Sequence, residues 1–217
     1  MVDPVKPSRR YDSPRRREQA AATRRSMLET AQRLFEADGY VATSVPAIAE
    51  QAGVALKTVY LAFETKANLL RVLWEERLSG EEADLDVTER AWYREMLDEP
   101  DAQRQLRLLA SQSRAVKSRS GLLMDVIRNA AGSDPEIAAL WKEIQSKLLG
   151  VQGSVVERLH EKDCLKGSLD VATATDILWA LNHPSLWYLF VVERGWSGQE
   201  YERWLGDIFI FEMLGKR

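Results

Sequence analysis

Apolar residues recur with a helical spacing along most of this chain, and this pattern constrains the fold more than any other feature. The clearest case is the segment from Pro135 to His160, in which large apolar residues return every three or four positions, as on one face of an amphipathic helix. No sustained alternation of apolar and polar residues, which would indicate strands, is found. The sequence therefore predicts an all-α protein.

Glycine and proline divide the second half of the chain into several helices. Breaks are predicted at Glu99-Pro100, Gly121, residues 132–135, Lys166-Gly167, His183-Pro184 and residues 195–197.

The N-terminal part combines short and long helices in a distinctive order. Helices are expected over residues 15–37, 45–52 and 55–63, followed by a longer one from Glu64-Thr65 to about Ser79. Gly39 ends the first, Thr43-Ser44 caps the second, and Gly53 separates the two short ones. Two brief helices joined by a glycine turn and placed between longer ones indicate a helix-turn-helix.

The residues of this unit fall into an inward and an outward set. The residues expected to point inward are Ile48, Ala49, Val54, Val59 and Phe63. The second short helix then presents Lys57, Thr58, Tyr60 and Leu61 outward, which is a polar and aromatic face suited to phosphates and base edges.

Positive charge is concentrated at the N-terminus, although the whole chain has a net charge of −3. Residues 1–25 contain eight basic and three acidic residues, a net charge of +5. Residues 1–14 contain three prolines and no apolar periodicity, as in a flexible leader. This end of the chain is suited to a nucleic-acid-binding arm, and a solvated tail is the alternative.

The sequence from about residue 20 to residue 70 resembles the DNA-binding domain of the TetR family of transcriptional repressors. The motifs that carry the resemblance are Gly39–Val45, Ile48–Val54, Thr58-Val59-Tyr60, Phe63, and Lys66 with Leu69-Leu70. A branch of the same family is also similar at residues 134–141 and in Arg194–Ser197, followed by Tyr201 and Trp204.

The resemblance implies an all-α, TetR-like architecture, in which an N-terminal three-helix helix-turn-helix domain precedes a C-terminal helical domain for ligand sensing and dimerisation. The expected organisation is a basic flexible leader (1–17), a DNA-binding domain (18–65) and a ligand-binding and dimerisation domain (66–217). The implied function is that of a repressor that binds a palindromic operator as a homodimer and is released by a small-molecule effector. Double-stranded operator DNA, an unidentified effector and a second copy are the expected partners, and no cofactor is expected.

The residues expected to contact DNA are Thr43, Ser44, Leu56, Lys57, Thr58, Tyr60, Leu61 and Lys66. In the family, positions matching Thr43 or Ser44, Thr58, Tyr60 and Lys66 commonly touch the phosphate backbone. Lys57 lies near the start of the recognition helix and is expected to read bases. Pro46 departs from the usual polar residue, and Leu56-Lys57 departs from the usual Lys-Gly pair, which should alter base preference.

Large side chains in the C-terminal part suggest two further surfaces. Candidates for the walls of a ligand pocket are Trp74, Trp92, Tyr93, Met96, Met124 and Trp141, with ordinary core packing as the alternative. Candidates for the dimer interface are Trp179, Trp187, Tyr201, Trp204, Ile208 and Phe211, with burial inside a monomer as the alternative.

Composition argues against other classes of protein. Cys164 is the only cysteine, so an intrachain disulfide and a cysteine zinc cluster are excluded. His160 and Cys164 are the only pair with possible ligand or nucleophile spacing, and neighbouring charges indicate exposure, so neither an enzyme nor a metal site is expected. The N-terminus does not resemble a secretory signal, and the most apolar stretch, residues 177–192, is too short and interrupted to span a membrane. A soluble cytoplasmic protein is expected; an all-helical scaffold would explain the aromatic residues but not Tyr60, Lys66 and the basic arm together.

Removing the leader should distinguish a DNA-binding arm from a tail. Deletion of residues 1–14 removes three cations, Lys6, Arg9 and Arg10. If the arm lies in the minor groove, operator affinity should fall by roughly tens-fold at low salt and much less at high salt, because counterion release then contributes little. Binding titrations of the full and truncated proteins at two salt concentrations measure this. Equal affinities at low salt would identify a tail.

Overall fold

The computed structural model describes residues 14–79 and 87–215, and the regular elements in these ranges are helical, apart from an isolated antiparallel bridge between Leu165 and Leu214. The elements are α1 (Pro14–Ala42), α2 (Val45–Gln51), α3 (Leu56–Phe63), α4 (Lys66–Ser79), η2 (Val87–Glu89), α5 (Ala91–Asp98), α6 (Ala102–Ala130), α7 (Pro135–Glu161), α8 (Val171–Leu181), α9 (Pro184–Trp187), η3 (Tyr188–Glu193) and α10 (Gly198–Met213). No helix of the described ranges is both long and apolar enough to cross a membrane. Of the predicted flexible leader (1–17), residues 1–13 lie outside the described residues, whereas residues 14–17 belong to α1, so the leader was predicted to extend too far.

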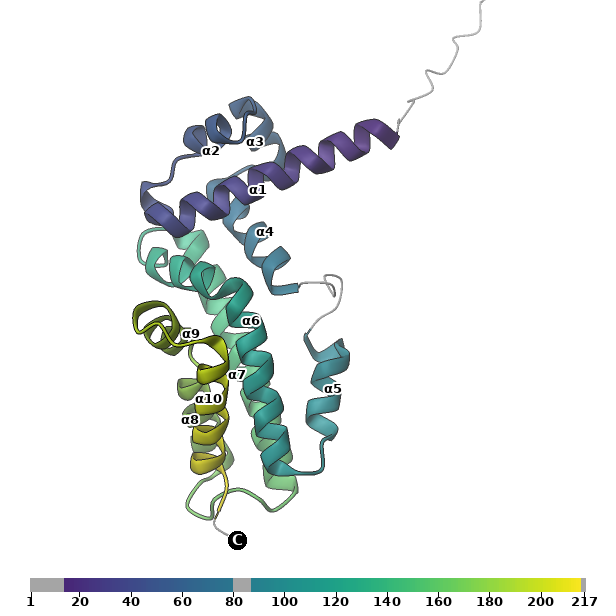
Figure 1. Ribbon diagram of the computed structural model, residues 1–217, viewed down its shortest axis with the longest axis vertical. Coiled ribbons are helices and arrows are strands. Elements are labelled where there is room, and N and C mark those ends of the chain that lie inside the picture. Colours follow the sequence, from purple (N-terminus) through teal and green to yellow (C-terminus); the bar gives the residue numbers. More distant parts are fainter. Residues whose placement is uncertain (1–13, 80–86, 216–217) are drawn as a thin grey trace, which may run out of the picture.

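The helices form two connected groups (Figure 1). Helix α1 lies across one end of the molecule with α2 and α3 beside it, and α4 leads from this group toward the other. The long helices α6 and α7 form the body, with α8 and α10 packed along them and α5 at one side. The predicted all-α fold is therefore confirmed.

The first helix extends further than the sequence indicated. Regular helical geometry is interrupted at Gly39, which has φ 79° and ψ 167°, and residues 40–42 then form a further helical turn. A positive φ is accessible to glycine at little cost because it has no Cβ. The predicted break at Gly39 is therefore confirmed, although helical residues resume after it.

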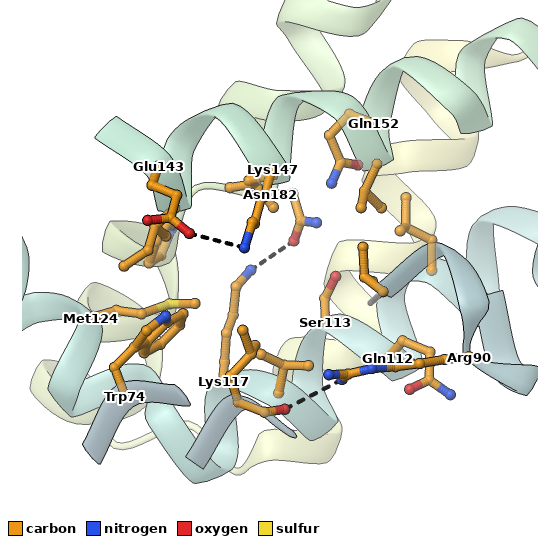
Figure 2. A pocket seen from close by; sticks show the side chains of 18 of the residues that line it. Trp74, Arg90, Gln112, Ser113, Lys117, Met124, Glu143, Lys147, Gln152 and Asn182 are labelled. Atoms are coloured by element: carbon orange, nitrogen blue, oxygen red, sulfur yellow. Dashed lines mark hydrogen bonds and ion pairs between the residues drawn. The ribbon is translucent and has the colours of Figure 1, made fainter. Parts of the chain in front are cut away.

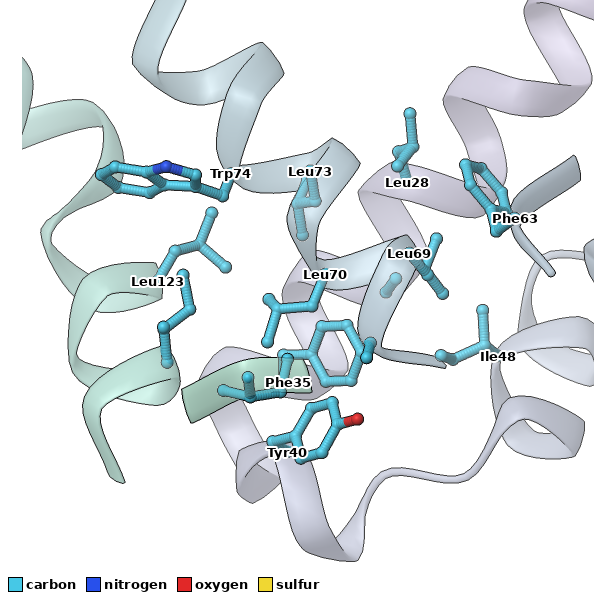
Figure 3. Packing of buried hydrophobic residues seen from close by; sticks show 14 of the residues in the cluster. Leu28, Phe35, Tyr40, Ile48, Phe63, Leu69, Leu70, Leu73, Trp74 and Leu123 are labelled. Atoms are coloured by element: carbon cyan, nitrogen blue, oxygen red, sulfur yellow. The ribbon is translucent and has the colours of Figure 1, made fainter. Parts of the chain in front are cut away.

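One hydrophobic core connects the helix-turn-helix to the body. Leu69, Leu70 and Leu73 of α4 are buried against Phe35 and other apolar residues of α1. The same cluster continues into Leu123 of α6, so α4 lies between the two groups (Figure 3). Packing is therefore continuous across residue 65, the predicted end of the DNA-binding domain. A second core lies further along the body, between α6, α7, α8 and α10.

The predicted break at Gly121 is wrong, because α6 runs without interruption from Ala102 to Ala130. Gly121 is buried, and a Cβ at this position would lie 2.7 Å from Cδ1 and Nε1 of Trp187. The glycine therefore makes room for the indole rather than ending the helix.

Alanine at Gly121 should destabilise the protein, whereas alanine at Gly150 should stabilise it. Both glycines lie inside long helices, but a Cβ at Gly150 would have no neighbour within 4 Å. Gly150→Ala should raise the free energy of unfolding by about 0.5–1 kcal/mol through helix propensity. Gly121→Ala should lower it by about 1–3 kcal/mol through overpacking against Trp187. Urea denaturation measures both variants, and a stabilising Gly121→Ala would contradict the tight packing of the indole.

Candidate DNA interface and ligand cavity

Local interactions set the angle between α2 and α3. The side chain of Ser44 caps α2 by accepting a hydrogen bond from the Ala47 amide at 3.2 Å, and Pro46 lies in the first turn, where its missing N–H costs no helical bond. Gly53 has φ 69°, and the following amide of Val54 donates to Ala49 O at 3.0 Å. These contacts produce the sharp turn that the glycine predicted.

The inward set of residues is as predicted, and so is the outward set except for Thr58. Ile48, Ala49, Val59 and Phe63 are buried and Val54 packs against the same cluster. On the other side of α3, Leu61 is 76% exposed, Tyr60 is 46% exposed, and Leu56 and Lys57 are also exposed. Thr58 is half-buried. Exposed apolar side chains beside a lysine and a tyrosine form a surface with no partner among the described residues.

Thr43 is not on this surface. Its side chain is 3% exposed, and its hydroxyl donates within α1, to Gly39 O at 2.8 Å and, more weakly, to Leu34 O at 3.2 Å. A hydroxyl committed to internal carbonyls is unavailable to DNA. Ser44 is exposed and is the member of the Thr43-Ser44 pair that reaches the surface.

Lys66 joins the helix-turn-helix to the body. Its Nζ donates to the carbonyls of Tyr40 at 2.9 Å and Thr43 at 3.1 Å and lies 4.1 Å from the centre of the Tyr40 ring. Partial burial lowers the Lys66 pKa, while nearby Asp134 opposes this effect. An ammonium has three N–H bonds, so these two carbonyls leave one N–H for an external anion.

Asp134 completes this contact from the start of α7. Its carboxylate accepts a hydrogen bond from the Tyr40 hydroxyl at 2.6 Å and caps α7 through the amides of Glu136 and Ile137. The bond from Tyr40 holds the pKa of Asp134 below its ordinary value. Burial, followed by the effect of Asp134, raises the pKa of the Tyr40 hydroxyl. The turn before α7 is therefore anchored to the segment that leads into α2.

A cavity of about 460 Å³ lies in the body, between α4, α6 and α7 (Figure 2). Of the side chains predicted to line a pocket, Trp74, Trp92 and Met124 do so. Leu109, Leu140 and Val151 are among the further apolar residues of the wall. Its size falls within the range of about 300–1,000 Å³ that is typical of small-molecule sites.

The other three predicted pocket residues lie elsewhere. Tyr93 and Met96 point into the second core, where they are buried, because both fall on the inner face of α5. Trp141 packs against the first core and meets His183 edge to face, with ring centres 5.9 Å apart.

Sequence reasoning missed the polar residues of the cavity. Lys117 is 4% exposed, and its Nζ donates to Asn182 Oδ1 at 2.7 Å and to the Tyr201 hydroxyl at 3.1 Å. Burial lowers the pKa of Lys117 to about 7. The sequence did contain a signal, because Lys117 falls on the buried face of α6, together with Leu106, Leu109, Ser113 and Met124.

Two residues predicted at the dimer interface are buried inside the fold of the single chain. Trp187 and Tyr201 are buried and pack edge to face, with ring centres 5.1 Å apart. They fill the space between α6 and α10, so they are unavailable to a partner. Trp179, Trp204 and Ile208 are half-buried, and Phe211 is 66% exposed.

His160 and Cys164 do not form a site. His160 is exposed, and the Sγ of Cys164 lies 3.3 Å from the carbonyl of Lys162. No group of three His, Cys, Asp or Glu residues within residues 14–79 and 87–215 is placed to hold a metal ion.

Comparison with known proteins identifies the helix-turn-helix segment. Residues 27–73 match the family described as "Bacterial regulatory proteins, tetR family". This range contains the buried core of α1–α4 and the exposed face of α3.

Two curated proteins and a solved structure extend the likeness. The HTH-type transcriptional regulator AcrR of Shigella flexneri is 26% identical over 154 residues, which cover 70% of this chain and 69% of AcrR. The probable HTH-type transcriptional regulator ArpR of Pseudomonas putida is 25% identical over 169 residues, 76% of this chain and 79% of ArpR.

The crystal structure of the transcriptional regulator FadR of Bacillus subtilis in complex with stearoyl-CoA has a similar fold. The TM-score is 0.66 at 20% identity, covering 86% of this chain and 97% of that chain. These relatives are named as regulators of transcription and not as enzymes. The matched helix-turn-helix is that of the tetR family of bacterial regulatory proteins, and the chain as a whole is similar to proteins named as transcriptional regulators.

Proposed function

We propose that this regulator is a repressor that binds a palindromic operator as a homodimer and leaves it when a small molecule enters the cavity. The observation that carries the proposal is the double role of α4. Its first half packs beneath the helix-turn-helix through Leu69 and Leu70, and its second half forms part of the cavity wall through Trp74 and Leu78. A ligand that displaces Trp74 would shift α4, and with it the helix-turn-helix of α2 and α3 that packs against α4.

The exposed face of α3 supports operator binding. Tyr60 and Leu61 are too exposed to contribute to the core, and Lys57 lies beside them near the start of the helix, where side chains of a recognition helix meet base edges. In this proposal Ser44, Thr58, Tyr60 and Lys66 contact phosphates, whereas Leu56, Lys57 and Leu61 enter the groove.

Exposed apolar residues on α8 and α10 support a dimer. These helices pack against each other and carry Trp179, Trp204, Ile208 and Phe211 on partly or fully exposed positions. Apolar patches of this kind often mark protein interfaces. A two-fold dimer would place two recognition helices about 34–36 Å apart, matching successive major grooves on one face of DNA.

Control by a ligand is supported by the cavity and by one relative. FadR has a similar fold and was solved with stearoyl-CoA. A mobility-shift titration on the promoter region of the protein's own gene tests the proposal. The proposal requires saturable, sequence-dependent DNA binding by a dimer. A protein that is monomeric in sedimentation equilibrium and binds DNA only non-specifically would contradict the proposal.

Lys57→Ala should relax base preference at one position of each half-site, at a cost of about 1–3 kcal/mol, because one bidentate base contact is lost. Selection of binding sites from a random DNA pool measures this. Lys142→Ala, at an exposed position of α7 outside the helix-turn-helix, is the control with the same change in charge. An identical consensus for Lys57→Ala and the parent would refute base reading by Lys57.

Tyr60→Phe should weaken binding to all duplexes alike, since loss of a phosphate contact removes affinity without removing sequence information. Competition titrations compare the loss of affinity for operator DNA with the loss of affinity for scrambled DNA. A loss confined to operator DNA would place the Tyr60 hydroxyl at a base edge instead.

A further inference from the structure

Lys117 is a buried cation that has only neutral partners. Asn182 and Tyr201 accept its hydrogen bonds, and no carboxylate of residues 14–79 and 87–215 pairs with it. Burying a charge without an opposite charge is costly, and removal from water is the cause of its lowered pKa. The protein therefore maintains an unfavourable arrangement on the wall of a cavity.

The acidic residues of the same wall are already paired. Glu143 binds Arg71 at 2.8 Å and Lys147 at 3.0 Å, and Glu75 lies 3.8 Å from Arg71. Both carboxylates are substantially exposed and therefore lie at the rim of the cavity, whereas Lys117 is buried. The rim carboxylates therefore do not neutralise Lys117.

Gln152 provides a second, independent sign of a ligand. Its side chain is fully buried on the cavity wall, opposite Lys117, and neither its amide nitrogen nor its amide oxygen has a hydrogen-bond partner in the described structure (Figure 2). A buried amide without partners costs free energy. Ser113 is also buried and lies on the cavity wall, one helical turn before Lys117 on α6.

We propose that the cavity binds a small amphipathic monoanion, an organic carboxylate whose oxygens meet the ammonium of Lys117 and the amide nitrogen of Gln152. The apolar body of the ligand would lie against Trp74, Met124 and Leu109. One unpaired buried cation matches one negative charge. This inference rests on the proposed ligand control, because it names the chemical class of the effector.

The lowered pKa gives the proposal a distinctive signature. A carboxylate stays ionised above about pH 5, and its arrival favours the charged form of Lys117. Because the pKa of Lys117 is about 7 without a ligand, binding at pH 8 should take up a proton, and affinity should fall as pH rises above 7. The other titratable or charged groups around Lys117 and along the wall are Tyr201, His183, Arg90, Glu75, Glu143 and Lys147.

His183 is the group among these whose titration most needs to be separated from that of Lys117. Its pKa is lowered from an ordinary value of 6.5, first by burial and then by Arg128 and Lys117. It is therefore neutral in the absence of ligand at pH 8, where the measurement is made. If proton uptake is lost when Lys117 is replaced, the proton is bound by Lys117 and not by His183.

Calorimetric titration of the full-length protein with decanoate tests the proposal without any variant. Titrations at pH 8 in buffers with different enthalpies of ionisation should show uptake of up to one proton, and titrations at pH 6 should show much less. The uncharged probe 1-decanol and the cationic probe decylamine should bind more weakly than decanoate and without proton uptake. Tighter binding of decylamine, or decanoate binding at pH 8 without a proton, would overturn the proposal.

Lys117→Met should then reduce decanoate affinity by about ten- to hundredfold and abolish proton uptake, while leaving affinity for 1-decanol unchanged. Lys142→Met, which removes a lysine outside the cavity wall, and Lys147→Met at the rim should retain both properties. Thermal unfolding of each variant confirms that it is folded. Loss of decanoate binding in Lys147→Met but not in Lys117→Met would assign the anion to the rim and overturn the role of Lys117.

The outcomes separate this inference from the proposed function. If 1-decanol and decanoate bind equally well, the cavity remains a ligand site and only the chemical class is wrong. If none of the three probes binds, the assignment of a carboxylate ligand to this cavity is overturned. If decanoate binds with proton uptake but the protein does not shift its promoter DNA, the proposed function fails while the assignment of Lys117 stands.

Discussion

The packing of α4 is the constraint on which the rest of the structure depends. Leu69, Leu70 and Leu73 are buried between the helices of the recognition unit and α6, so the helix has little freedom to move independently of either. Close-packed interiors transmit displacements because they do not deform continuously. The exposed face of α3 and the cavity, although well separated along the chain, therefore both depend on the position of α4.

A polar contact reinforces this packing on the side of α7. Asp134 accepts from Tyr40 and caps α7, while Lys66 holds the carbonyls of Tyr40 and Thr43. The group of helices α1–α3 thus meets the body through α4, through the packing of α1 against α6, and through the turn before α7. Asp134 and Lys66 both bind the segment from Tyr40 to Thr43, which leads into α2. A change at the cavity that moved α4 relative to α7 would therefore also alter the orientation of α2 and α3.

Much of the fold could be predicted from the sequence, because local physics determines it. The turn at Gly53, the cap at Ser44 and the outward face around Tyr60 depend on neighbouring residues, and the structure agrees on each.

The errors concern features that depend on distant residues. Gly121 was interpreted as a helix break because its partner, Trp187, is far away in the chain. Burial within a subunit and burial between subunits have the same aromatic composition, so Trp187 and Tyr201 were assigned to the wrong surface. Lys117 was missed because lysines in helices are usually solvated.

The contact between Gly121 and Trp187 has a consequence for how sequences of this kind diverge. The indole occupies the space that any side chain at position 121 would require, so neither residue can change freely while the other is kept. Among homologous sequences we expect the two positions to vary together, with an indole at one accompanied by glycine at the other and a larger residue at 121 accompanied by a smaller one at 187. This covariation would join the middle of α6 to the end of α9, two points that no motif of the chain connects.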